Sequence, residues 1–455
     1  MTDVVTAGAG DPLVPSRLRR ALLAAARNLG WLLASRGLLA VLSLVYLGIT
    51  TRMLGIEGFG RFALITTAAQ ALTLMVGFQT WQIVVQFGVG HIARGDTAAL
   101  ARLLRLCAWL DVFSAVLGSA LGAWILWVWG GDMGIKPGLM RDTMIYLIVQ
   151  LVTIRSMPLG ILRLRDRFSL GALADSVTPV MRLVGAVFVA AVVPTVKGFL
   201  YAWMVAELAT ALAYWIAVAR TEDLRAVFRG RAPVRAVLAD NPGLLRFAFS
   251  TNVNSTLSLS GKQLPLLLVG ATIGPLAAGG FRLAAQLAQA LAKLAQLLTR
   301  AAFPEIVRGV RDASARAVTR LLGRMFAISS AVALAILAVV VAVGQPMLAL
   351  VGGPAYAGAY PILLWLAFAG CLDLATVGFE PVLMALHRSG TALIVRIVSV
   401  IVMVAAALLL MAGQGATGAA MAVFAGSVVT ALALTLTTFT IAGRAGAGGE
   451  AGVAQ

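Results

Sequence analysis

The sequence has few charged residues and very few cysteines. Only 12% of its 455 residues are charged and 60% are hydrophobic, with a mean hydropathy of +0.95, which excludes an ordinary soluble domain. Its two cysteines, Cys107 and Cys371, lie in apolar runs without metal-ligand spacing around them, so no metal or redox chemistry is predicted. A Gly-x4-Gly-Lys loop is also missing, which argues against a pump that hydrolyses ATP itself. We therefore expect a polytopic membrane protein that is not an enzyme and needs no cofactor.

Acidic residues are scarce as well: 18 of them stand against 36 lysines and arginines, a net charge of +18. In a soluble chain this excess would suggest nucleic acid, but in a membrane protein its placement must first be tested against the positive-inside rule. Hydropathy predicts an all-α protein of about twelve transmembrane helices, in two pseudo-symmetric six-helix bundles. The apolar segments lie near residues 31–50, 62–88, 103–129, 143–162, 169–193, 198–219, 247–272, 277–300, 324–350, 361–385, 391–412 and 417–441.

The connections between these segments carry very unequal numbers of cations. If the N-terminus is cytosolic, 24 arginines fall on the cytosolic side and five cations on the other. This asymmetry predicts a multi-pass membrane protein with both termini in the cytosol. The basic excess then reflects topology, and no nucleic-acid partner is predicted. The first twenty residues contain no apolar core with a small-residue cleavage site, so we expect a cytosolic tail and no cleaved signal peptide.

The two halves of the chain share three repeated groups of residues. Three groups of residues recur in the same order and spacing: Gly55, Gly60 and Phe62 match Gly274, Gly279 and Phe281; Arg94, Gly95 and Arg102 match Arg308, Gly309 and Arg316; and Pro158 and Arg165 match Pro381 and Arg388. Because each half has an even number of spans, we expect a pseudo-twofold axis along the membrane normal and a substrate site between the halves. The predicted parts are a cytosolic tail 1–28, a bundle 29–219, a cytosolic linker 220–246, a bundle 247–442 and a cytosolic tail 443–455.

The stretch 282–300 carries a polar stripe at helical spacing. The stripe consists of Arg282, Gln286, Gln289, Lys293, Gln296 and Arg300, at intervals of four, three, four, three and four. These positions share one face of a helix roughly 27 Å long, close to the thickness of the hydrocarbon core. Inter-helix polar packing is one interpretation, but we favour a polar cavity inside the bundle. Lys262 lies on a similar face of the preceding segment and is expected to share that cavity with Arg282 and Lys293.

Charged residues inside the apolar segments are costly and persist only when they are paired or face water. Seven are cations and five are acids: Arg36, Arg155, Arg182, Lys262, Arg282, Lys293 and Arg396, against Asp111, Asp175, Glu207, Asp373 and Glu380. The positive surplus would suit a pyrophosphate head group. Gln70 could bond sugar hydroxyls or bridge helices. The acids are the candidates for ion coupling.

Several stretches resemble a known family. The first turn, with Leu54, Gly55, Phe59, Gly60 and Phe62, is similar to that of bacterial polysaccharide flippases of the Wzx type, in the multidrug/oligosaccharidyl-lipid/polysaccharide exporter superfamily. The stretches 274–281, 303–304 and 352–360 are similar to the same family in order and spacing. Many members have Tyr at the position of Phe59, which leaves the substrate unassigned.

The resemblance implies a flippase of the bacterial inner membrane. It would move an undecaprenyl-pyrophosphate-linked oligosaccharide from the cytosolic to the periplasmic face, driven by a sodium or proton gradient, for lipopolysaccharide or exopolysaccharide biosynthesis. It also implies contact with membrane lipid and with polysaccharide polymerase and export machinery.

Two alternatives remain at this stage. A multidrug exporter of the same fold should have an acidic cavity. A membrane-embedded acyl- or glycosyltransferase should have a large extracytosolic loop or a carboxylate cluster, whereas the longest such loop here, 130–142, is short. His91 and Asp96 have the spacing of an acyltransferase motif, but the corresponding stretch of the second half, 305–309, has no histidine. We therefore do not expect catalysis there.

Overall fold

The computed structural model describes residues 13–130, 137–221, 234–308, 315–379 and 389–451. These described residues are helical almost throughout, without a strand. The elements are α1 (Leu13–Val76), α2 (Thr80–Ala93), α3 (Thr97–Trp129), α4 (Pro137–Val152), α5 (Ser156–Leu164), α6 (Phe168–Val192), α7 (Val196–Ala219), α9 (Val234–Asp240), α10 (Leu244–Thr272), α11 (Pro275–Arg308), α12 (Ala315–Gly352), the short 3₁₀ helix η1 (Pro354–Ala359), α13 (Tyr360–Ala375) and α15 (Ser389–Ala451).

Two of the longest helices are each a pair of spans joined at a glycine. The backbone of α1 leaves the helical region at Gly55 (φ 65°), and that of α15 does so at Gly415 (φ 55°). These dihedral angles are accessible to glycine because it has no Cβ. Eight described stretches are long and apolar enough to cross a membrane, and one of them, Val41–Ala93, includes parts of both arms of α1 together with α2. The expected all-α polytopic fold of two helical bundles is confirmed.

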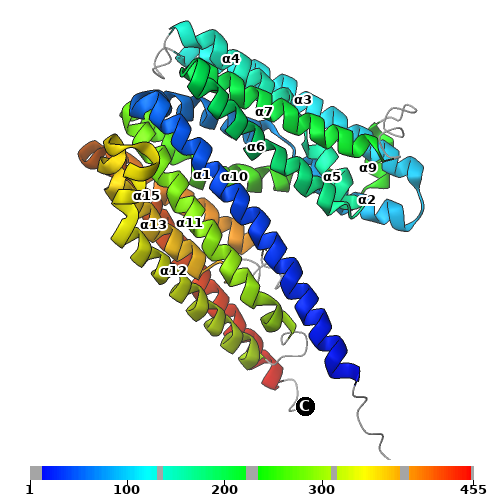
Figure 1. Ribbon diagram of the computed structural model, residues 1–455. Coiled ribbons are helices and arrows are strands. Elements are labelled where there is room, and N and C mark those ends of the chain that lie inside the picture. Colours follow the sequence, from blue (N-terminus) through cyan, green and yellow to red (C-terminus); the bar gives the residue numbers. More distant parts are fainter. Residues whose placement is uncertain (1–12, 131–136, 222–233, 309–314, 380–388, 452–455) are drawn as a thin grey trace, which may run out of the picture.

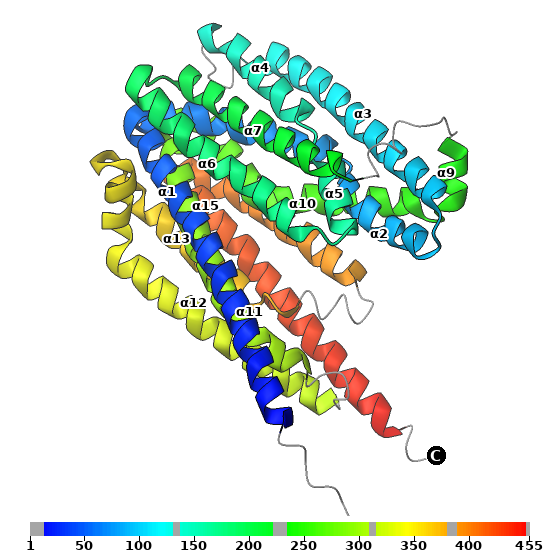
Figure 2. The same ribbon diagram turned by 45° about the vertical axis from the view of Figure 1, so that its right-hand side comes forward.

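The helices form two lobes that meet at one end and diverge at the other (Figure 1). One lobe contains α2–α7 and α9, and the other contains α11–α13 and α15, with α1 running between them. In Figure 2, the start of α1 and the end of α15 lie together at the end where the lobes diverge. Both ends of the described chain therefore lie on the same side of the molecule.

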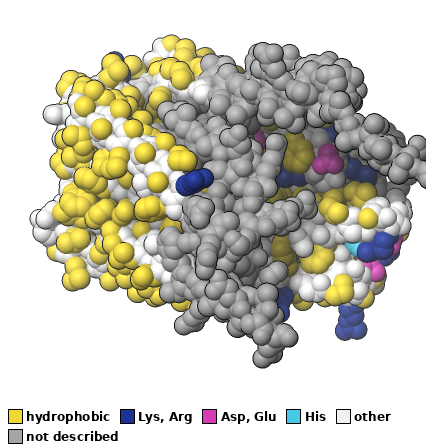
Figure 3. All heavy atoms as spheres, turned by 90° about the horizontal axis from the view of Figure 1, so that it is seen from below, with side chains coloured by type: hydrophobic (Ala, Val, Ile, Leu, Met, Phe, Trp, Pro, Cys, Tyr) yellow, Lys and Arg dark blue, Asp and Glu magenta, His cyan; other side chains and the backbone are white. Residues whose placement is uncertain are grey.

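The outer surface is apolar, as a lipid-facing surface must be. Large hydrophobic side chains point outward on many helices, including Trp127, Phe249 and Leu409, which are 84%, 72% and 77% exposed. Seen from the diverging end, hydrophobic side chains cover one half of the face, and charged side chains gather in a hollow in the other half (Figure 3). Charged side chains therefore lie in this hollow as well as at the outer edge of the same half (Figure 3).

The interior contains two large hydrophobic cores. The upper core joins α1, α7, α10, α11 and α13 around residues such as Phe62, Phe199 and Leu287. The lower core joins α2, α3, α5 and α9 around residues such as Ile83 and Met157, and it also includes the beginning of α10 at Leu244. α10 therefore starts in the lower core and ends in the upper one.

The lobes meet where the glycines of the two repeats face each other. A Cβ added to Gly60 would lie 1.7 Å from the carbonyl oxygen of Pro275, and one added to Gly279 would lie 2.0 Å from that of Ile56. The second arm of α1 and the beginning of α11 therefore cross backbone against backbone, an approach that requires small residues. We call this crossing the closed-end contact.

Hydrogen bonds surround the closed-end contact. Arg52 donates from Nε to the carbonyl oxygen of Val351 at 3.3 Å and from Nη2 to that of Leu350. The Tyr356 hydroxyl donates to the carbonyl oxygen of Gly55 at 3.3 Å. The first turn and the stretches 274–281 and 352–360 meet at the closed-end contact. Their glycines therefore allow the lobes to approach closely and also form local turns.

Candidate functional site

Three arginines and one glutamate form a charged cluster inside the molecule. Arg182 of α6 and Glu207 of α7 are paired with 2.6 Å between Nη2 and Oε1. Nη2 of Arg155, just before α5, lies 2.9 Å from the other oxygen, Oε2, of Glu207. The angle of this approach is not that of a hydrogen bond, so Oε2 keeps an unused acceptor position although it is buried. We call Arg155, Arg182, Arg282 and Glu207 the arginine cluster.

Arg282 joins this cluster from the other lobe. It lies on α11 and interacts electrostatically with Arg182, Tyr46 and Tyr146. Among the described residues no carboxylate forms an ion pair with Arg282. Three arginines against Glu207 leave two positive charges. The surplus lies between the lobes, where a charge is tolerated only if a ligand or water solvates it.

Aromatic rings hold Arg182 in place. Its guanidinium lies 5.4 Å from the ring centroid of Trp203, a distance typical of a cation–π contact. It also interacts electrostatically with Tyr46 of α1, and the Tyr46 and Trp203 rings meet edge to face at 5.4 Å. α1, α6 and α7 therefore position one cation together.

Two helices are interrupted at the same level of the N-terminal lobe. Residues 77–79 separate α1 from α2, and residues 153–155 separate α4 from α5. Gln79 has a left-handed backbone (φ 48°, ψ 44°), a conformation that costs a non-glycine residue about 1–2 kcal/mol. Interruptions of this kind occur at membrane depth only where the freed backbone groups are satisfied by protein or line a cavity.

Asp111 joins the two interruptions. Its Oδ1 accepts from the Thr80 hydroxyl at 2.8 Å, and its Oδ2 accepts from the Met157 N–H at 3.2 Å. The carboxylate thus satisfies groups in the first turns of both α2 and α5, where the helix dipoles favour a negative charge. Asp111 therefore stabilises the fold, apart from any role in transport.

A polar cavity of about 310 Å³ lies beside the interruptions. Asp111, Asp175 and Arg155 line it, together with Gln79 and Tyr214. Asp175 accepts a hydrogen bond from the Tyr214 hydroxyl at 2.6 Å. Arg155 lines this cavity and also faces Glu207. The cavity with Asp111 and Asp175 is therefore adjacent to the arginine cluster.

A second polar cavity, of about 250 Å³, lies within the C-terminal lobe. Lys262, Gln289, Lys293 and Asp373 line it. The predicted polar stripe on α11 is therefore divided: Gln289 and Lys293 face this cavity, whereas Arg282 lies in the arginine cluster and does not line it. Eleven residues of helix separate Arg282 from Lys293, roughly 16 Å, which is too far for one small cavity.

The remaining predicted site residues lie elsewhere. Gln70 and Gln286 are half-buried on α1 and α11, and neither lines one of the two polar cavities. The Arg36 side chain and the whole of Glu380 lie outside the described residues. His91 bonds Asn241 through Nε2 at 2.8 Å and Arg94 through Nδ1 at 3.0 Å.

Asp96 begins α3, where its carboxylate accepts from the Ala99 N–H at 2.8 Å; this bond lowers the pKa of the Asp96 carboxyl. Asp96 and His91 therefore bond to different partners and do not form a catalytic pair with each other.

Sequence reasoning missed the aromatic residues and the interruptions. Tyr46, Tyr146 and Trp203 look like ordinary apolar positions, and no pattern in the sequence marks them as partners of arginine. The interruptions could have been found, because Gly77 lies near one of them and Pro158 just after the other, and such pairs of breaks indicate binding sites.

Known proteins resemble this chain in sequence and in fold. Residues 25–310 match the family model described as polysaccharide biosynthesis protein. The inner membrane protein YghQ of Escherichia coli K12 is 26% identical over 343 residues, which cover 74% of this chain and 95% of that protein. This relative and the apolar helices support a multi-pass protein of the inner membrane.

Solved structures share the fold at low sequence identity. The lipid II flippase MurJ in an inward closed conformation gives a TM-score of 0.69 at 11% identity, covering 89% of this chain and 86% of that one. An inward-facing multidrug resistance MATE transporter of the MOP superfamily gives 0.67 at 16% identity, covering 89% and 95%. The outward-facing MATE transporter gives only 0.54 at 17% identity, covering 90% and 95%. With a family match over more than half of its length, the chain belongs to the polysaccharide biosynthesis protein family and has the two-lobe fold of flippases and transporters of the MOP superfamily.

Proposed function

We propose that this protein is a flippase that moves an undecaprenyl-pyrophosphate-linked oligosaccharide from the cytosolic to the periplasmic face of the inner membrane by ion-coupled alternating access. The observation that carries this proposal is the arginine cluster, which has two more positive than negative charges and receives a residue from each lobe. A pyrophosphate supplies the negative charge that this cluster lacks, and arginine binds phosphate through paired hydrogen bonds.

The polar cavity of the C-terminal lobe would complement the arginine cluster. Gln289, Lys262 and Lys293 offer amide and ammonium groups to sugar hydroxyls or to a second phosphate. A cation-exporting multidrug transporter of the same fold is the rival proposal. The arginine cluster disfavours it, because a cationic drug would meet a positive field at the junction of the lobes.

Replacing Arg282 by glutamine is expected to leave the protein folded but to reduce polysaccharide export by about ten- to a hundredfold, the range for one lost hydrogen bond to a charged group. Export is measured as periplasmic polysaccharide at equal amounts of membrane-inserted protein. Gln286→Ala, one turn along the same helix, is the matched control and should be nearly neutral. Wild-type export by the Arg282→Gln variant would remove the arginine cluster from the transport mechanism.

The cavity on α11 has its own test. In a background without Cys107 and Cys371, cysteines at Gln289 and Lys293 should react with a membrane-impermeant thiol reagent, whereas a cysteine at Leu287 should not, because Leu287 is buried in the upper core. Lys293→Gln should lower export without loss of folded protein. Absence of labelling in every transport state, with full activity of Lys293→Gln, would contradict the cavity.

The topology rests on the unequal distribution of cations. Reporter fusions after Arg246 and after Lys197 should report opposite sides of the membrane, with Arg246 in the cytosol. Because the lobes diverge at the end that carries both described chain ends, this topology would make the structure open toward the cytosol. Two fusions on the same side would overturn it.

For ion coupling we propose the acids of the N-terminal cavity, Asp111 and Asp175, ahead of Asp373 in the other lobe. Asp175 is the more informative to replace, since Asp111 supports the interrupted helices. The Asp175→Asn variant should remain folded and lose the dependence of transport on the ion gradient, measured by uptake of lipid-linked substrate into vesicles with an imposed sodium or proton gradient. Unchanged gradient dependence would exclude Asp175.

A further inference from the structure

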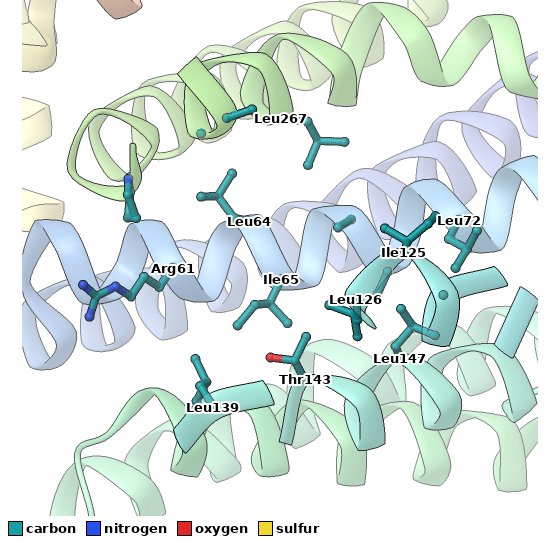
Figure 4. A pocket seen from close by; sticks show the side chains of 16 residues that line it. Arg61, Leu64, Ile65, Leu72, Ile125, Leu126, Leu139, Thr143, Leu147 and Leu267 are labelled. Carbon is teal, nitrogen blue, oxygen red and sulfur yellow. The ribbon is translucent and has the colours of Figure 1, made fainter. Parts of the chain in front are cut away.

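A third cavity, apolar over most of its length, lies at the seam between the lobes near the closed-end contact. It has a volume of about 110 Å³. The second arm of α1, α3 and α4 line it from one lobe, and Leu267 and Gly270 of α10 line it from the other (Figure 4). Its walls are mainly leucine, isoleucine and alanine, so a hydrocarbon chain is the chemistry that fits it.

The polar side chains are Arg61 at one end and Thr143 nearer the middle, between Leu139 and Leu147 (Figure 4). Figure 4 shows Arg61 at that end, with Leu72 and Leu147 toward the other. Thr143 lines the cavity and is 4% exposed, yet its hydroxyl has no hydrogen-bond partner. Nε of Arg61 is likewise buried without a partner, although its Nη2 donates to Glu57. Buried polar atoms are normally satisfied, so these two atoms indicate a missing acceptor.

The surface beside the polar end has a positive balance, from residues that do not themselves line the cavity except for Arg61. Arg141 is exposed in the first turns of α4, and Lys197 pairs with Asp142 at 3.0 Å. With Arg61 and its partner Glu57, three cations stand against two acids, which leaves one positive charge. An anionic head group is therefore favoured over a zwitterionic one.

The length of the cavity fits one membrane leaflet. Arg61 and Leu72 are eleven residues apart on one helix, roughly 16 Å, and the hydrocarbon core of a bilayer is about 30 Å thick. The cavity, of about 110 Å³, would hold a segment of one acyl chain, because a cavity of similar size binds a single benzene molecule. The rest of the chain would lie outside the cavity, and the ester and phosphate would lie near Arg61 and Thr143. A polyprenyl chain of many isoprene units would exceed this length.

We propose that this cavity binds one acyl chain of an anionic membrane phospholipid, whose head group accepts hydrogen bonds from Arg61 and Thr143. Because both lobes line the cavity, the bound lipid stabilises the arrangement in which the closed-end contact is formed. The inference concerns lipid binding and does not depend on the identity of the transported cargo.

The test uses the purified full-length protein in detergent, with lipid adducts counted by native mass spectrometry. Phosphatidylglycerol should bind about tenfold more tightly than phosphatidylcholine of the same chains, as expected for a charge-assisted hydrogen bond. Arg61→Gln should abolish this preference. Ala68→Phe, which fills the cavity, should weaken binding of both lipids by at least tenfold.

Thr143→Val has a matched control in Thr67→Val. Thr67 is also on a transmembrane helix with a buried, unpartnered hydroxyl, but it does not line the cavity. Thr143→Val should weaken phosphatidylglycerol binding several-fold, and Thr67→Val should not change it. Equal effects of these two variants, or undiminished binding by Ala68→Phe, would overturn the proposal. Tighter binding of a polyprenyl phosphate than of phosphatidylglycerol would also overturn it, because the cavity would then belong to the cargo.

Discussion

Replacing Gly60 or Gly279 by alanine is expected to abolish transport while the protein still inserts into the membrane. In each variant the new Cβ would meet a backbone carbonyl oxygen at 2.0 Å or less, and backbone cannot turn aside as a side chain can. Overpacking against it costs about 3 kcal/mol, which lowers the population of the state with a formed closed-end contact about a hundredfold.

The neighbouring residue provides the control. A Cβ on Gly280 would meet Ala359 at 3.4 Å and Ile56 at 3.8 Å, which are ordinary contacts, so Gly280→Ala should export polysaccharide at nearly the wild-type rate. Export is measured in cells at matched protein levels. Spin labels on α3 and α12 would report whether the lobes have moved apart at the closed end. Normal export by both Gly60→Ala and Gly279→Ala would show that the closed-end contact is dispensable.

Removing the Glu207 carboxylate is expected to destabilise the protein strongly. Glu207 is 1% exposed and is the acid that faces both Arg155 and Arg182. Glu207→Ala would leave the buried Arg182 without its carboxylate partner in a low-dielectric interior, and breaking a buried pair in this way costs about 3–5 kcal/mol. The variant should unfold at a lower temperature in detergent and accumulate poorly in membranes.

A double variant separates charge from packing. If the unpaired cation causes the loss of stability, Glu207→Gln combined with Arg182→Gln should be more stable than Glu207→Gln alone. Arg282→Gln should not lower stability, since Arg282 has no described carboxylate partner to leave behind. A double variant that is less stable than both single variants would mean that Glu207 acts mainly through packing.

The all-α architecture could be predicted because hydrophobic runs and charged connections reflect the membrane directly. The repeated glycines could also be found, but the sequence could not show that Gly60 and Gly279 touch, because that contact depends on how the lobes pack. The pairing of Arg182 with Glu207 was equally out of reach. The two residues lie on neighbouring helices, 25 positions apart in the sequence. By spacing alone, Asp175 was an equally plausible partner for Arg182, and Arg155 was an equally plausible partner for Glu207.

The polar stripe on α11 shows what sequence periodicity can predict and what it cannot. Its spacing correctly indicates one helical face, yet a face roughly 27 Å long passes several different neighbours. Arg282 interacts electrostatically with Tyr46, Tyr146 and Arg182, whereas the exposed Lys293 lines a separate cavity. Periodicity identifies which residues share a side of a helix, and only packing decides what lies opposite each of them.

Because α10 passes through both cores, it affects how the lobes move apart and which backbone amides exchange their hydrogen with solvent slowly. Leu244 is anchored in the lower core and Val269 in the upper one, so any relative rotation of the lobes must tilt or bend this helix. Pro265 removes one backbone hydrogen bond within it. Slow amide exchange should therefore fall into two cooperative units. Their boundary would cross α10 and the interrupted helices, and would not follow the division between the two halves of the chain.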